Sequence, residues 1–202
     1  GVDAVYEAAF QRAGIVRIFE VDDMFDCAEL LARQQPPKGD RLAIITNAGG
    51  PGVMTTDALI ALDGDLAKIS EETIGKLNEC LPPFWSHGNP VDVLGDAPPD
   101  RFAKALEIVI KDDGVDAVLV ILTPQAMTDP AATAHAVGRV AAKAHKPILA
   151  AWMGGHMVAE GLQILNEAGI PSYTAPEKAI RAFMHLVSYA RNLEILHETP
   201  RD

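Results

Sequence analysis

The chain has 202 residues, 49% of them apolar, which is enough for the core of one sizeable domain. Its formal charge of −11 at pH 7 and pI near 4.9 argue against a nucleic acid or an acidic membrane as partner, because a negative surface repels phosphate-rich polymers. A bound phosphate must therefore be held by local groups.

The first 34 residues predict two helices around a β-rich run, at residues 2–12, 15–19 and 22–34, with Asp22 as the N-cap of the second helix. A proline- and glycine-containing break follows at residues 36–40. From Leu42 onward, apolar runs alternate with helical patterns, as expected for a parallel sheet. The expected strands are residues 42–46, 66–69, 116–122, 148–152 and 171–174, and the expected helices are 52–62, 71–79, 99–111, 130–144, 156–168 and 176–192.

The runs at residues 117–122 and 147–152 are apolar throughout rather than alternating, which indicates strands covered by helices on both faces. We therefore expect an α/β fold, a flavodoxin-like three-layer sandwich with a mostly parallel sheet and an N-terminal helical lead-in. The predicted organisation is a helix-strand-helix linker region at 1–40, the flavodoxin-like domain at 41–195 and a C-terminal linker at 196–202.

The chain lacks the features of an exported or membrane-spanning protein. No apolar run approaches the roughly 18 residues that span a bilayer, and the N-terminus lacks the basic-then-apolar plan of a signal peptide, so a cytoplasmic location is expected. Cys27 and Cys80 have neither metal-binding nor redox spacing, and we expect both to be reduced. Because the chain starts with Gly rather than Met, we expect it to be a piece of a longer polypeptide.

The segment from Leu42 to Val53 reads as a buried strand, a glycine-rich turn and a helix that opens near Pro51. Gly49, Gly50 and Gly52 allow close backbone approach, and a helix N-terminus offers free N–H groups and a positive dipole end to a phosphoryl group. A tight connection that binds nothing is the alternative. The spacing matches neither G-x-G-x-x-G nor the P-loop, so a classical nucleotide site is not expected.

Ligands of open parallel sheets bind at the carboxyl ends of the strands. Three segments are expected to converge there: residues 47–52, 123–129 and 153–156. The long loop at 81–99 is a fourth candidate, because loops of this length are usually functional or interfacial.

The candidate chemical groups on these loops each have a structural alternative. His87 and His156 could be phosphoryl nucleophiles or anion contacts, although a structural role is favoured for both. Asn89 and Asp92 either fix their loop or contact the site. We expect Gly154 and Gly155 to be further loop contacts. We expect structural roles for the remaining histidines: His135, His145, His185 and His197. No metal-ligand spacing is present.

Together these motifs resemble a known family. Residues 46–53 (TNAGGPGV), 56–59 (TDAL), 88–92 (GNPVD), 117–124 (AVLVILTP) and 151–155 (AWMGG) are similar to the ligase-CoA domain of the ADP-forming acetyl-CoA synthetase family. This is the second of the family's two flavodoxin-like domains, and it also resembles the carboxyl-terminal domain of the succinyl-CoA synthetase β subunit. The resemblance covers nearly the whole chain.

The resemblance implies a reversible reaction in which acyl-CoA and phosphate give an acyl phosphate, a histidine accepts the phosphoryl group, and an ATP-grasp domain passes it to ADP. It implies that one helix N-terminus of this chain cradles the phosphohistidine through the backbone of Asn47, Ala48, Gly49, Gly50, Pro51, Gly52 and Val53. The carrier histidine would lie upstream of Gly1, so the isolated chain is expected to be inactive.

The implied partners are the CoA-binding, first flavodoxin-like and ATP-grasp domains and an acyl-CoA or acyl phosphate. CoA, ATP or ADP and Mg would act in the full-length enzyme and none is expected on this domain alone. A second copy of the same protein, in a homo-oligomer, is a further possible partner. Two alternatives stay open: the acyl-CoA-sensing region of a GNAT-type protein lysine acetyltransferase, and a free-standing flavodoxin-like receiver or binding protein.

Overall fold

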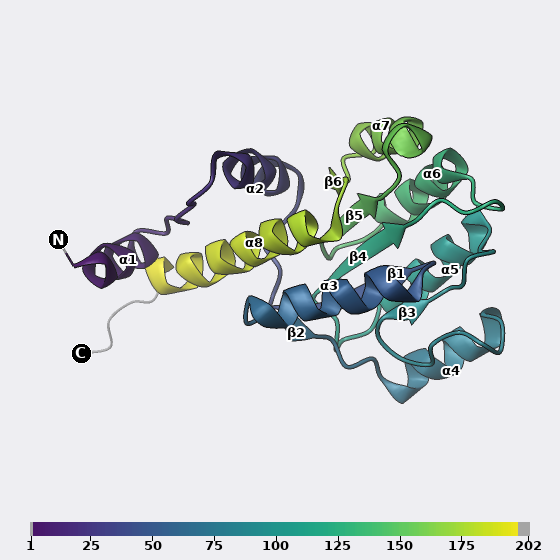
Figure 1. Cartoon of the computed structure of the whole chain (residues 1–202). Coiled ribbons are helices and arrows are strands. Elements are labelled where there is room, and N and C mark those ends of the chain that lie inside the picture. Colours follow the sequence, from purple (N-terminus) through teal and green to yellow (C-terminus); the bar gives the residue numbers. More distant parts are fainter. Residues whose placement is uncertain (1, 198–202) are drawn as a thin grey trace.

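A computed structural model describes residues 2–197 and shows a parallel sheet with helices on both faces (Figure 1). The strands are β1 (Arg41–Thr46), β2 (Asp65–Leu66), β3 (Val91–Asp92), β4 (Ala117–Leu122), β5 (Ile148–Trp152) and β6 (Ser172–Tyr173). The helices are α1 (Asp3–Arg12), α2 (Val21–Arg33), α3 (Gly49–Ala61), α4 (Glu71–Cys80), α5 (Pro99–Val109), α6 (Pro130–Ala141), the 3₁₀ helix η1 (Gly155–Val158), α7 (Ala159–Glu167) and α8 (Pro176–His197).

The sheet has the order β2-β1-β4-β5-β6, and β3 also pairs with β1. All the pairs are parallel; β2 lies beside the start of β1, where Arg41 faces Asp65, and β3 beside its end, where Ile45 faces Val91. Together β2 and β3 occupy one position in the sheet, so the order is the 2-1-3-4-5 of flavodoxin-like folds. The expected fold class is confirmed, and the strand order reverses between β1 and β4.

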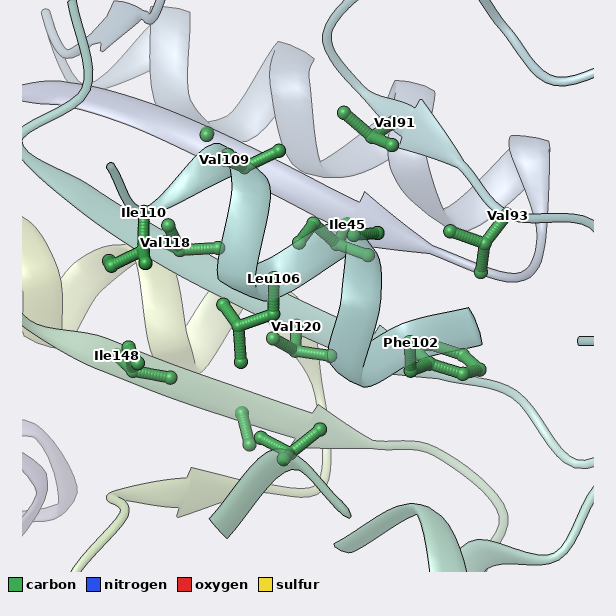
Figure 2. Packing of buried hydrophobic residues seen from close by; sticks show 14 of the residues in the cluster. Ile45, Val91, Val93, Phe102, Leu106, Val109, Ile110, Val118, Val120 and Ile148 are labelled. Atoms are coloured by element: carbon green, nitrogen blue, oxygen red, sulfur yellow. The ribbon is translucent and has the colours of Figure 1, made fainter. Parts of the chain in front are cut away.

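One face of the sheet packs against α4, α5, α6 and α7 through a buried apolar cluster. Figure 2 shows Ile45 of β1, Val118 and Val120 of β4 and Ile148 of β5 around Leu106 of α5. These strand residues alternate with those of the opposite face, which is the arrangement that the continuous apolar runs predicted.

The opposite face packs against α2, α3 and α8. Ile44 of β1, Leu119 and Ile121 of β4 meet Phe183 of α8 and Leu30 of α2 in a second buried cluster. In Figure 1, α8 runs on past the sheet and α1 lies near its far end.

The N-terminal segment departs from two expectations. Residues 15–19 form no strand, because no neighbouring strand pairs with them; Asn192 Nδ2 donates to the Ile15 carbonyl instead, and Phe19 lies exposed beside the Arg17 guanidinium. Asp22 is not the N-cap of α2. The cap residue is Glu20, without a side-chain cap, and Asp22 lies in the first turn, where a carboxylate still favours the helix dipole.

Several element boundaries also differ from the sequence expectation. Helix α3 begins at Gly49 rather than near residue 52, strand β2 ends at Leu66, and β3 was not expected at all. The helix expected at 156–168 is divided into η1 and α7, and α8 continues to His197.

The domain boundary at residue 40 stays a prediction, although Leu30 of α2 is fully buried in the core beside α8. Residues 198–202 of the expected C-terminal linker lie outside the described residues. Within residues 2–197, no helix combines the length and the hydropathy needed to cross a bilayer.

Candidate functional site

Loops that follow four strands meet at the carboxyl edge of the sheet. Gln125, after β4, donates a hydrogen bond of 3.1 Å to the Asn47 carbonyl after β1, and its side chain covers the backbone of Gly95 after β3. Pro124 packs against Gly154, after β5, so closely that a side chain on this glycine would collide with the proline ring. The expected convergence of the loops is therefore confirmed.

Asn47 ties the ends of β1 and β4 together. Its Nδ2 donates to the Thr123 carbonyl at 2.8 Å, and its Oδ1 accepts from the Thr123 N–H at 2.9 Å. The side chain is 1% exposed. Asn47 thus connects the ends of the two strands, and its side-chain amide is turned toward the Thr123 backbone.

The N-terminus of α3 offers two adjacent backbone donors at this edge. Within the described residues, the N–H groups of Gly49 and Gly50 make no hydrogen bond, because the first residues of a helix have no acceptor in their own helix. Both glycines are exposed. Unpaired N–H groups at the positive end of a helix dipole form an anion-binding geometry.

The other residues expected in the cradle have different surroundings. The Ala48 N–H donates to Thr46 Oγ1 at 3.1 Å, Pro51 has no N–H, and the Gly52 N–H donates to the Ala48 carbonyl. Gly52 is buried, with Thr46 Cγ2 only 3.0 Å from where a Cβ would stand. Val53 lies one turn into α3, where the N–H joins the helical ladder, and its side chain is exposed.

Asp92 lies beside the first residue of α3. A Cβ on Gly49 would stand 3.3 Å from Asp92 Oδ2, so this carboxylate borders Gly49, one of the two residues with a free N–H group. Asp92 Oδ1 also accepts the Leu94 N–H at 2.9 Å, which confirms the interpretation that Asp92 fixes its loop. Contact with a functional site stays a prediction.

Asn89 has a structural role inside the sheet. Its Oδ1 accepts from the Ile44 N–H at 2.9 Å, and its Nδ2 donates to the carbonyls of Leu42 and Ala67. The side chain thereby fills the gap between β2 and β3 along β1. It satisfies backbone groups that no strand reaches, and it does not point to the carboxyl edge.

Gly154, Gly155 and His156 form the turn after β5. Gly154 and Gly155 have φ of 144° and 58°, conformations that favour glycine, and Gly155 has open space where a Cβ would be. His156 is exposed within the short η1. The turn borders the loop after β4 through the contact between Gly154 and Pro124.

His87 is held by its own loop. Its Nδ1 lies 2.9 Å from Asn78 Oδ1 and its Nε2 lies 3.0 Å from the Pro83 carbonyl. Its ring also packs against Trp85, which is buried and donates to the same Asn78 oxygen at 2.9 Å. This anchoring fits a structural role. The neighbouring Phe84 is instead 86% exposed.

Apolar side chains surround this edge. Val53 and Met54 of α3, Met127 after β4 and Met157 of η1 are all largely exposed. A rim of this kind is suited to contact with another protein surface.

Sequence reasoning missed Thr46 and Gln125, whose hydrogen bonds shape the turn. Their positions were the only signal in the sequence: Thr46 ends the apolar strand β1, and Gln125 lies in the loop after the apolar strand β4.

The described residues offer no metal centre, since no group of three or more His, Cys, Asp or Glu side chains is placed to hold an ion.

The fold and the edge define a flavodoxin-like domain that presents a helix N-terminus at its topological switch point. The chain belongs to the Ligase-CoA domain family, whose model matches residues 42–196.

Relatives of known name match most of this chain. It is 41% identical to acetate–CoA ligase [ADP-forming] I of Archaeoglobus fulgidus, over 92% of this chain and 26% of that protein. It is 35% identical to the α subunit of acetate–CoA ligase [ADP-forming] II of Pyrococcus furiosus, over 94% of this chain and 42% of the subunit.

A solved structure of acetyl-coenzyme A synthetase 1 from Candidatus Korarchaeum cryptofilum, in complex with phosphate and ADP, matches with a TM-score of 0.89 at 35% identity. The match covers 97% of this chain and 43% of that one. The chain therefore spans between about a quarter and two fifths of these relatives.

Proposed function

We propose that this chain is the phosphoryl-receiving module of an NDP-forming acid–CoA ligase. In this role the N–H groups of Gly49 and Gly50 hold the phosphoryl group of a phosphohistidine that another part of the protein presents. The observation that carries the proposal is the pair of adjacent, unbonded N–H groups at the start of α3, at the sheet edge where ligands of this fold bind.

The proposed contribution is electrostatic. In the ligase reaction, acyl-CoA and phosphate give acyl phosphate and free CoA, the phosphoryl group passes to a histidine, and ADP accepts it to form ATP. Gly49 and Gly50 would hold the negative oxygens while the group rests on the histidine. They neither donate nor remove a proton, so the acid–base and nucleotide chemistry belongs to the rest of the ligase.

The site is weak by itself. An exposed helix dipole contributes about 0.3–1 kcal/mol to anion binding, well short of the roughly 4.1 kcal/mol that a millimolar dissociation constant requires. A second donor surface must therefore face Gly50, and the apolar rim around Met54 and Met127 is placed to bury against it. The CoA-binding, first flavodoxin-like and ATP-grasp domains are the proposed partners.

A glycine substitution in the full-length ligase tests this function. Gly50→Val places a branched side chain over the donors, while the open space around Gly50 leaves the fold intact. Gly75→Val is the matched control, because Gly75 is also an exposed helical glycine with open space around it, on α4.

We expect the Gly50→Val ligase to transfer the phosphoryl group at least about tenfold more slowly than the unchanged ligase. Both variants should keep their stability, because valine in a helix costs no more than the glycine that it replaces. Normal turnover in Gly50→Val, or an equal loss in Gly75→Val, would contradict the proposed site.

A further inference from the structure

We propose that Asp92 lowers the affinity of anions for the Gly49 and Gly50 amides, so that free anions leave the cradle unoccupied. This inference rests on the proposed function and deepens it. It concerns how the cradle stays available for a phosphoryl group that a carrier delivers.

The Asp92 carboxylate has a fixed position. Asp92 pairs with Thr46 in the parallel ladder of β3 and β1, and its N–H donates to Ser86 Oγ at 2.9 Å. Its Oδ1 accepts the Leu94 N–H at 2.9 Å, and its Oδ2 is the atom that borders Gly49. A strand pairing and two hydrogen bonds therefore hold this negative charge beside the donors of α3.

A fixed negative charge at this place lowers the affinity for any anion that docks on α3. At a separation of about 6 Å in the dielectric of water, repulsion between unit charges reduces an affinity by about threefold. The repulsion free energy is proportional to the charge of the ligand, so a dianion loses about the square of this factor, or about ninefold.

A tethered phosphoryl group tolerates this loss, and a free anion does not. A carrier that belongs to the same protein has a high effective concentration at the site, so it docks despite weak intrinsic affinity. Free phosphate gains nothing from tethering. Asp92 thus lowers the occupancy of the cradle by free anions, while the delivered group still docks because of its high effective concentration.

The experiment titrates this chain with sulfate and with perchlorate, two tetrahedral oxyanions of different charge, and follows the amide signals of Gly49 and Gly50 by NMR. Asp92→Asn removes the charge and keeps an Oδ1 acceptor for the Leu94 N–H. Asp57→Asn is the control, because Asp57 is an exposed carboxylate on the same helix, beyond its first turn.

We expect Asp92→Asn to bind perchlorate about threefold and sulfate about ninefold more tightly than the unchanged chain, with little change in Asp57→Asn. A purely structural role for Asp92 would not make the gain depend on ligand charge. Equal affinities in all three proteins overturn the proposed role of Asp92 and leave the cradle standing. Absence of shifts at Gly49 and Gly50 in every protein contradicts the proposed function itself.

Discussion

Asn47 and Thr123 exchange two hydrogen bonds, of 2.8 and 2.9 Å, across the point where the strand order reverses. An asparagine side chain here imitates one more step of the β1–β4 ladder, because its amide offers a donor and an acceptor as a backbone peptide does. The pair fixes how the loop after β1 leaves the sheet and therefore where α3 starts.

Removal of this amide should destabilise the domain. Asn47→Ala leaves the N–H and carbonyl of the half-buried Thr123 without partners, and we expect it to lower the free energy of unfolding by about 2 kcal/mol. Asn166→Ala is the control, since Asn166 is exposed and, among residues 2–197, its side chain forms a hydrogen bond only with Arg33; a loss below about 1 kcal/mol is expected. If urea unfolding gave the same loss of unfolding free energy for both variants, the hydrogen bonds between Asn47 and Thr123 would not be a special source of stability.

Two glycines of the same helix turn should respond in opposite ways to alanine. Gly50 has no atom within 4 Å of a Cβ position, so Gly50→Ala should preserve or raise stability by up to about 1 kcal/mol. At Gly52 a Cβ would meet Thr46 at 3.0 Å and Pro90 at 3.3 Å, so Gly52→Ala should cost about 1–2 kcal/mol. Thermal unfolding of both variants tests this order. A Gly52→Ala protein that is more stable than the Gly50→Ala protein would contradict it.

Asp112 should make stability depend on pH at the acidic end. Burial raises its pKa, but hydrogen bonds from Thr73, from the N–H and hydroxyl of Ser70 and from the Gly114 N–H outweigh burial and lower it to about 2. A depressed folded-state pKa stabilises the fold above the unfolded value of 3.8, and this contribution is lost as pH falls through about 2.

The comparison of Asp112→Asn with the unchanged chain measures this effect. We expect a loss of about 2 kcal/mol at pH 7 that largely disappears near pH 2. Asp113→Asn, at the exposed neighbouring position, should have the same unfolding free energy as the unchanged chain at both pH values. A pH-independent loss at Asp112 would point to packing rather than ionisation.

Neither His87 nor His156 should carry the phosphoryl group. Both ring nitrogens of His87 are engaged by its own loop, and His156 belongs to a short helix rather than a long loop that could travel between two sites. In the full-length ligase with radiolabelled ATP, His87→Asn and His156→Asn should both still become labelled. Loss of label in a folded His156→Asn protein, or labelling of this chain alone, would overturn the assignment.

The sequence was sufficient to predict the layers of the fold. Continuous apolar runs such as residues 117–122 required helices on both faces, and the alternation of strands and helices required parallel pairing. The same reasoning failed at residues 15–19, because a β-rich composition predicts a strand only when a neighbouring strand is available to pair with it.

The sheet edge where the loops meet was predictable from the sequence, but the details of the glycine turn were not. Glycines and a proline obscured the start of α3, because these residues are poor helix formers in the interior yet acceptable in a first turn. The position of Asp92 depends on β3, a strand of only two residues after a proline, which has too little periodicity to detect. Long-range pairing with β1, not local propensity, brings it to Gly49.

The central claim is that the first turn of α3 receives a phosphoryl group through the Gly49 and Gly50 N–H groups. The most direct test is an NMR titration of this chain with inorganic phosphate at constant ionic strength, with all backbone amides assigned. The account predicts saturable shifts, at about millimolar or weaker affinity, that are largest at Gly49 and Gly50 and absent from Gly75 of α4. Shifts confined to other parts of the chain, with Gly49 and Gly50 unmoved, would contradict it.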